Sequence, residues 1–204
     1  LGDVPAKVLG PKALEALAQK VRTGGSLVTL AGVSSYGAGG YAGSPVAEIL
    51  PFAIDDEAEQ YVEGSVKMVP TFESVNVSYM QLFDERLAVG ELKSRFKEFP
   101  PFGGYVKIGN VRPDASVIAG SPTGEPLIVQ RNVEQGTVVS LAIDSTWEWA
   151  FNPFVDERDT SEAFNRFWRR MALELVFNNS ASGHNVEVSL NSGKATPGDD
   201  MAVT

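Results

Sequence analysis

A predicted helix followed directly by a buried strand is the feature of this sequence that most constrains its fold. Residues 11–22, PKALEALAQKVR, carry Pro11 in the first turn and apolar residues at helical spacing, and Gly24 and Gly25 follow. Proline at the start and glycine just past the end are signals that bound a helix. Residues 26–31, SLVTLA, form a continuous apolar run, which is typical of a strand covered on both faces. The pattern predicts an α/β fold.

The rest of the chain continues this alternation of strands and helices. Residues 1–5 predict the end of a strand, which makes a βαβ unit with the helix and strand that follow. Ser44 and Pro45 predict the N-cap and first turn of a short helix that ends at Pro51. Further predicted elements are strands at 66–72, 115–120, 125–131 and 136–144, the last two joined as a hairpin, helices at 91–99 and 159–177, and a loop at 99–105.

The composition narrows the class of function. The chain of 204 residues has a net charge of −9 and scattered Lys and Arg residues, which argues against a nucleic-acid partner. It contains no cysteine, so a catalytic thiolate, a disulfide and a cysteine-bound metal are excluded. No apolar stretch is long enough to cross a bilayer and no segment resembles a signal peptide, so any anchor is expected outside this sequence.

The chain is expected to contain one domain and the edge of another. Residues 1–179 predict an α/β domain whose N-terminal part is missing. Residues 180–204 begin as a linker of small residues and continue as an alternating strand, a turn at Pro197-Gly198 and the start of another strand. This tail predicts the start of another domain, so the sequence is interpreted as a fragment of a longer protein.

Two stretches carry a resemblance to a known family. Residues 21–52, VRTGGSLVTLAGVSSYGAGGYAGSPVAEILPF, and residues 136–151, GTVVSLAIDSTWEWAF, resemble the glutamine amidotransferase-like domains of bacterial membrane-associated proteins, relatives of the class I glutamine amidotransferases. The resemblance implies a three-layer, flavodoxin-like α/β fold. It also implies a larger, membrane-anchored parent protein with β-sandwich or von Willebrand A modules. Under this resemblance, the tail at residues 180–204 is expected to form the first strands of such a β-sandwich.

The catalytic residues of that superfamily are not matched here. The resemblance implies a cysteine at the turn after the first strand and a histidine after a later strand. This sequence has Gly32-Val33-Ser34-Ser35 at the turn, and Asp144 stands near the expected position of the histidine. Ammonia release from glutamine needs a strong nucleophile paired with a base. The comparison with the family therefore predicts a domain without amidotransferase activity.

Ser34 and Ser35 are nevertheless candidate catalytic residues, because they follow an apolar strand as the nucleophile of a hydrolase elbow does. The Gly-x-Ser-x-Gly pattern of such an elbow is incomplete at this turn. The pattern favours the alternative that small hydroxylated residues hydrogen-bond the backbone of a tight turn. The only histidine, His184, lies in the predicted linker, where an exposed residue is favoured over a member of a catalytic triad.

A ligand site is predicted where the strands end, because ligands of open α/β sheets bind outside the carboxyl ends of the strands. Asp3, Asp144 and Glu148 would together bind a divalent cation if these ends converge, which would make Asp144 a candidate catalytic residue as well. Acids at strand ends also serve as hydrogen-bond acceptors in loops. The glycine-rich loop would cradle an anion, or its glycines provide turns with positive φ. The candidate ligand-binding residues are Asp3, Ser35, Tyr36, Gly37, Asp144 and Trp147.

The sequence as a whole predicts a non-catalytic, amidotransferase-like binding or interaction domain of a larger cell-envelope protein. One alternative is a hydrolase that uses Ser34 or Ser35, or a metal held by Asp3 and Asp144. Another is a structural spacer between modules. No cofactor and no bound metal are predicted. The expected partners are other modules of the same polypeptide or envelope proteins, and the expected location is membrane-associated, periplasmic or extracellular, with a cytoplasmic location left open.

Overall fold

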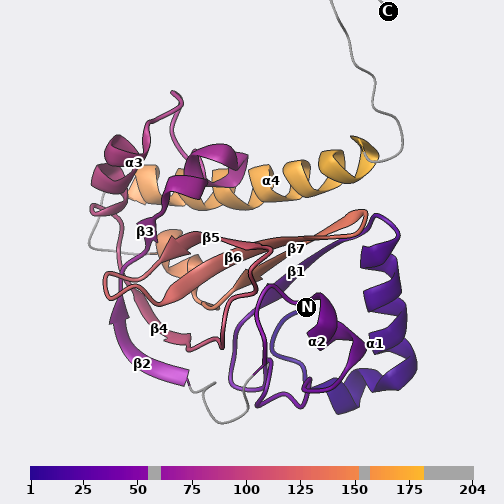
Figure 1. The fold of residues 1–204 in the computed structure, drawn as a ribbon. Coiled ribbons are helices and arrows are strands. Elements are labelled where there is room, and N and C mark those ends of the chain that lie inside the picture. The colour runs from indigo at the N-terminus through magenta and orange to yellow at the C-terminus, as the bar shows by residue number, and fades with distance from the viewer. Residues whose placement is uncertain (55–60, 152–156, 182–204) are drawn as a thin grey trace, which may run out of the picture.

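A mixed β-sheet forms the centre of the structure (Figure 1). The computed structural model describes residues 1–54, 61–151 and 157–181. Its strands are β1 (Ser26–Leu30), β2 (Tyr61–Val66), β3 (Val69–Pro70), β4 (Phe102–Val106), β5 (Ala115–Gly120), β6 (Pro126–Val133) and β7 (Gly136–Leu141). Five of these strands form the main sheet in the order β1-β7-β6-β5-β3, and β2 pairs with β4 in a separate two-stranded sheet.

Helices lie on both sides of the main sheet. The α-helices are α1 (Ala6–Arg22), α2 (Pro45–Ile49), α3 (Val89–Phe96) and α4 (Glu157–Ala181), and the short 3-10 helices are η1 (Phe72–Asn76), η2 (Ser78–Met80) and η3 (Thr146–Trp149). α4 runs along one side of the sheet, and α1 and α2 lie on the other side (Figure 1). α1 and α4 each contact β1 and β7. The predicted α/β class is therefore confirmed.

The N-terminal segment has the arrangement expected of a βαβ unit. β1 pairs with β7 in parallel, with Leu30 opposite Leu141. Leu1 lies beside β1, where its amino group donates to the carbonyl oxygen of Val28 at 2.8 Å. The N–H of Leu30 donates in turn to the carbonyl oxygen of Leu1 at 2.9 Å. Residues 1–5 are not assigned to a strand, so the predicted strand end is represented only by these two hydrogen bonds of Leu1 beside β1.

Local sequence signals set the geometry of the first two helices. α1 begins at Ala6, earlier than predicted, and Gly10 interrupts its helical backbone with a φ of 76°. The residue before a proline is disfavoured in helical conformation, so Gly10 takes up the constraint that Pro11 imposes. α2 begins as predicted, because the side chain of Ser44 accepts a hydrogen bond from the backbone N–H of Ala47.

The sheet is more antiparallel than predicted. Among the described strands, β1 and β7 are the one parallel pair, and the pairings β7–β6, β6–β5 and β5–β3 are antiparallel. The predicted hairpin joins β6 to β7, where Val133 pairs with Gly136. The finer flavodoxin-like arrangement is thus not established by the strand order.

The prediction of a loop at residues 99–105 is confirmed for residues 99–101 and wrong for residues 102–105. Phe102 begins β4, and Gly104 pairs with Glu63 of β2. A Cβ atom on Gly104 would collide with the phenolic oxygen of Tyr61. The glycines that suggested a loop instead let the Tyr61 ring lie against the backbone of the neighbouring strand.

A cluster of aromatic side chains joins η3, α3, β4 and α4 in the core. Trp149 is fully buried at its centre. The Trp149 ring lies 5.1 Å from Phe99, 5.2 Å from Phe102, 5.8 Å from Phe167 and 6.1 Å from Phe96, measured between ring centroids. Aromatic pairs at such separations stabilise a core beyond the area that they bury. The cluster holds the segment after β7 against α4 and the two-stranded sheet.

We expect the variant Gly136→Ala to lower the free energy of unfolding by about 3 kcal/mol. Its Cβ atom would collide with the backbone oxygens of Val21, in the last turn of α1, and of Gly25, just before β1. Gly90→Ala is the matched control, because its Cβ would have nothing within 4 Å and it lies inside α3. That variant should be stabilised by up to about 1 kcal/mol. Urea unfolding measures both changes, and an unaffected Gly136→Ala variant would contradict the close approach.

Candidate functional site

The turn after β1 uses the Ser35 hydroxyl to close its own backbone. Ser35 is 4% exposed. Its hydroxyl donates to the carbonyl oxygen of Gly32 at 2.8 Å and accepts from the N–H of the same residue at 3.0 Å. The Ser35 hydroxyl thus acts as donor and as acceptor toward the backbone of the same residue, Gly32. The geometry matches the predicted turn and not an activated nucleophile, which needs a base within hydrogen-bonding distance.

Tyr36 has the strained backbone of the turn, with a φ of 48°. Such a conformation is uncommon for a residue other than glycine. The buried Tyr36 hydroxyl donates to the carbonyl oxygen of Leu141 and lies 3.1 Å from the Thr29 hydroxyl. Its ring packs edge-on against Phe52 at 4.9 Å. The Tyr36 side chain therefore links the turn to both β1 and β7.

Little free space lies beside these two residues. The cavity that Ser35 and Tyr36 line has a volume of about 10 Å³. A volume of this size accommodates about one water molecule. Ser34 is less buried, and its backbone N–H donates to Asp3 Oδ1. The carboxylate of Asp3 thus holds the turn through the backbone of Ser34.

The glycine-rich loop that follows has a structural explanation. Gly40 and Gly43 have φ angles of 74° and 69°. A Cβ atom on Gly39 would collide with the carbonyl oxygen of Ser34. The carbonyl of Gly37 accepts a hydrogen bond from the N–H of Gly40 at 2.8 Å. The loop matches the predicted series of turns with positive φ.

The acids at the other strand end form a separate site. Asp144 is exposed just after β7, and Glu148 follows in η3. Burial raises the pKa of Glu148, a hydrogen bond from the N–H of Gly103 lowers it, and the charge of Asp144 raises it again. The net shift is upward. Within the described residues, no group of three His, Asp or Glu side chains is arranged to hold a metal ion.

Sequence reasoning missed the phenol that completes this acidic site. Burial raises the pKa of Tyr61, and the charges of Asp144, Glu63 and Glu148 raise it further. Tyr61 and Glu63 come from β2, and they reach Asp144 and Glu148 because β2 pairs with β4 beside η3. No short-range sequence signal connects residues so far apart in the chain.

A groove of about 800 Å³ adjoins these acids. We call it the acidic–aromatic groove. Trp147, one of the predicted ligand-binding residues, is 54% exposed in it, and Phe151 is 75% exposed. It is lined by Glu63, Gly64, Ser65, Lys67, Glu98, Phe99, Pro100, Pro101, Phe102, Gly103, Trp147, Glu148 and Phe151.

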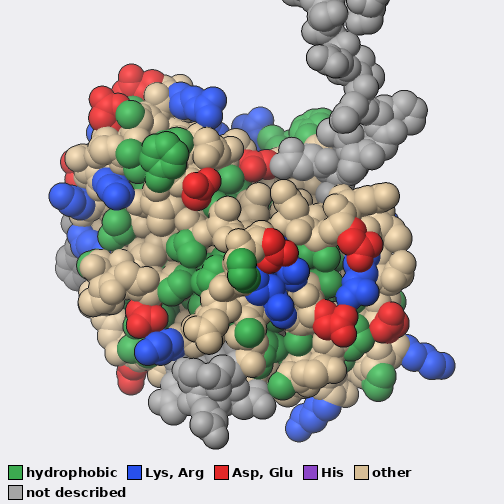
Figure 2. Space-filling view, viewed as in Figure 1, with side chains coloured by type: hydrophobic (Ala, Val, Ile, Leu, Met, Phe, Trp, Pro, Cys, Tyr) green, Lys and Arg blue, Asp and Glu red, His purple; other side chains and the backbone are tan. Residues whose placement is uncertain are grey.

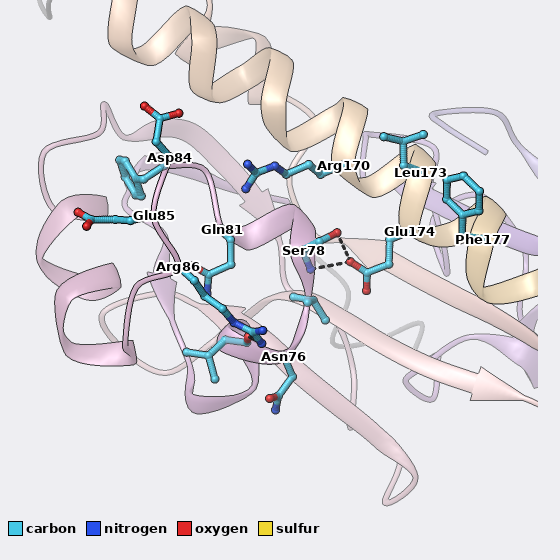
Figure 3. A pocket seen from close by; sticks show the side chains of 13 residues that line it. Asn76, Ser78, Gln81, Asp84, Glu85, Arg86, Arg170, Leu173, Glu174 and Phe177 are labelled. Atoms are coloured by element: carbon cyan, nitrogen blue, oxygen red, sulfur yellow. Dashed lines mark hydrogen bonds between the residues drawn. The ribbon is translucent and has the colours of Figure 1, made fainter. Parts of the chain in front are cut away.

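A second hollow, of about 740 Å³, lies between α4 and the segment 75–86 (Figure 3). Glu174 of α4 points to Ser78 and accepts hydrogen bonds from its backbone N–H and its hydroxyl. Arg86 donates to the carbonyl oxygen of Val75 at 2.9 Å. Acidic and basic side chains are mixed around this hollow, so its charge indicates no particular ligand. These contacts hold α4 to the body of the molecule.

The predicted site residues thus fall into two groups. Asp3, Ser34, Ser35 and Tyr36 belong to the closed turn after β1. Asp144 and Trp147 belong to the acidic site and the groove after β7. The first group follows β1, except for Asp3, which precedes α1 and follows no assigned strand, and the second group follows β7. Their hydrogen bonds give the two groups different roles. His184 and the predicted β-sandwich strands lie outside the described residues, and α4 itself extends to Ala181.

Comparisons with known proteins give a likeness of fold. No family model matches this chain. No curated protein matches it either. A solved structure of the cytoplasmic protein STM1381 from Salmonella typhimurium LT2 has a TM-score of 0.63 and 23% identity, and the match covers 86% of this chain and 70% of that one. The cytoplasmic protein STM3548 from Salmonella typhimurium has a TM-score of 0.64 and 19% identity, with the same coverages.

These comparisons correct the predicted location. Both similar proteins are cytoplasmic by name, which contradicts the expected membrane-associated, periplasmic or extracellular domain. That expectation depended on the family resemblance alone, and no residue of the chain supported it independently. In the part of the chain that the structure describes, no helix has both the length and the apolar character needed to cross a membrane.

We expect Ser35→Ala to destabilise the fold by about 1 to 3 kcal/mol, because it removes both hydrogen bonds to the backbone of Gly32 in a buried place. Ser34→Ala is the matched control. The Ser34 hydroxyl makes no hydrogen bond within the described residues, so this change should cost less than about 0.5 kcal/mol. Thermal and urea unfolding measure the difference, and equal stabilities of the two variants would contradict the structural role of Ser35.

We expect Glu148 to make folding stability fall as pH rises. Its folded pKa lies above the ordinary 4.5, so between these two values the folded state holds more protons than the unfolded state. Stability therefore decreases through this window, and Glu148→Gln should remove the decrease. Asp144→Asn should lower the pKa of Glu148, because it removes a nearby negative charge. Carboxyl NMR titration measures the pKa, and an unchanged value in Asp144→Asn would refute the coupling.

Proposed function

We propose that this chain is a non-catalytic binding domain with a class I glutamine amidotransferase-like, flavodoxin-like fold. The observation that carries the proposal is the closed turn after β1. Ser35 and Tyr36 direct their hydroxyls to the backbone, beside a cavity of about 10 Å³. A catalytic elbow instead presents its nucleophile to a substrate-sized space.

The chemistry available to the chain supports the same proposal. The sequence has no cysteine and a single histidine, His184. A serine hydroxyl needs a base to become a nucleophile. Asp3 accepts a hydrogen bond from the backbone of Ser34, so this carboxylate acts on the turn and not on a reacting hydroxyl. The hydrolase alternative has no comparable observation in its favour.

The acidic–aromatic groove is the binding surface in this proposal. It lies beside η3, directly after β7, where ligands of open α/β sheets are bound. Exposed aromatic side chains such as Trp147 and Phe151 are a common feature of interaction surfaces. The proposed partner is another protein or another module of the same polypeptide. The two similar proteins are named cytoplasmic, and we propose the same compartment for this chain.

The purified chain should release no ammonia from glutamine above the rate of buffer alone. The physical reason is that, among the residues that the structure describes, no base pairs with the candidate serines, and the turn lacks space for the substrate. A coupled glutamate dehydrogenase assay measures the release, and a known glutaminase serves as the positive control. An electrophilic glutamine analogue followed by intact-protein mass spectrometry tests for a covalent adduct. Ammonia release that Ser34→Ala or Ser35→Ala abolishes would overturn the proposal.

A further inference from the structure

The carboxylates of the acidic–aromatic groove lack ion-pair partners. Within the described residues, none of Glu63, Glu98 and Glu148 takes part in an ion pair, and neither does the adjacent Asp144. Acids elsewhere do pair, and on the face shown in Figure 2 acidic and basic side chains lie next to one another. Such pairs include Arg131–Asp114 at 2.9 Å, Arg22–Glu48 at 2.6 Å and Lys107–Glu125 at 3.5 Å. The groove therefore gathers several carboxylates that no ion pair within the described residues neutralises.

The one cation that lines the groove does not neutralise these acids. Lys67 directs its ammonium group to the carbonyl oxygen of Lys97, at 2.6 Å. The three carboxylates of the lining and the neighbouring Asp144 thus outnumber one lysine that is already engaged. A ligand that brings positive charge would relieve the repulsion between these groups.

The aromatic part of the groove fits the same kind of ligand. Trp147 and Phe151 are largely exposed, and Phe99, Pro100 and Pro101 extend the apolar lining beside them. A guanidinium group stacks on an aromatic face and also forms paired hydrogen bonds with a carboxylate. Arginine side chains therefore match both components of the lining.

The shape of the groove favours an extended ligand over an enclosed small molecule. Small-molecule sites bury most of the ligand surface. Here Trp147 is 54% exposed and Phe151 is 75% exposed, so the groove of about 800 Å³ lies open to solvent along its aromatic side. A peptide segment can lie in such a groove with several side chains in contact.

We propose that the acidic–aromatic groove binds a positively charged, arginine-containing peptide segment of a partner protein. Arginine side chains of the segment stack on Trp147 and Phe151, and their guanidinium groups face Glu63 and Glu148. This inference rests on the proposed function as a binding domain and adds the chemistry of the partner. The binding is dominated by exposed charges, so it weakens as the salt concentration rises.

Fluorescence anisotropy of a labelled peptide of alternating arginine and glycine, titrated with the full chain, tests the proposal. We expect Glu63→Gln and Glu148→Gln each to weaken binding by about three- to fivefold, and Trp147→Ala by about fivefold. Glu15→Gln is the matched control, because Glu15 is an exposed acid on α1 and does not line the groove. It should leave the affinity unchanged. Raising the salt to about 0.3 M should reduce the affinity of every form that binds.

Four results would overturn the inference. They are no binding of the arginine peptide at low salt, equal binding of a glutamate–glycine peptide, unchanged affinity in all three groove variants, and competition by free spermidine as effective as that of unlabelled peptide. The last result would assign the groove to small cations. Because glutamine hydrolysis is measured separately, failure of peptide binding alone leaves the non-catalytic proposal standing. Ammonia release would instead refute the proposed function.

Discussion

A buried network of hydroxyl groups joins the two parallel strands to the turn between β1 and α2. The Thr29 hydroxyl donates to that of Ser140 at 2.7 Å, and the Tyr36 hydroxyl lies 3.1 Å from Thr29 and donates to the carbonyl of Leu141. A buried polar group without a partner costs free energy, so these residues constrain one another. The position of the turn follows from this network, and the cavity beside Ser35 has a volume of only about 10 Å³. The same contacts that stabilise the sheet also occupy the hydroxyl groups of the turn after β1.

The turn after β1 is closed, whereas the segment that follows β7 borders an open groove. The acidic–aromatic groove depends on the two-stranded sheet, because β2 contributes Glu63 to its lining and β4 contributes Phe102 and Gly103. The aromatic cluster around Trp149 anchors η3 in the core, while Trp147 of the same 3-10 helix stays exposed. Rigid support beneath an exposed aromatic residue is typical of a binding surface. The proposed binding role thus follows from how the core anchors this segment.

Periodic apolar patterns and end signals made much of the fold predictable. The Ser44-Pro45 start of α2, the hairpin at Gly136 and the buried face of α4 with Phe167 and Met171 all followed from local sequence. The pairing of β2 with β4 did not, because its glycines have the composition of a loop and acquire their role only beside Tyr61. The turn that contains Ser34 and Ser35 was predictable, because the apolar run of β1 ends just before it. The coupling of Glu148 to Tyr61 was not, since it depends on tertiary contact.

Hydrogen exchange at the turn tests the central claim most directly. The N–H groups of Gly32, Ser34 and Ser35 are all hydrogen-bonded, to Ser35 Oγ, Asp3 Oδ1 and the carbonyl of Gly32. A permanently closed turn therefore predicts slow exchange at these amides, with protection approaching that of β7. Exchange as fast as in an unstructured peptide would show that the turn opens readily, and that result would contradict the account of a closed, non-catalytic elbow.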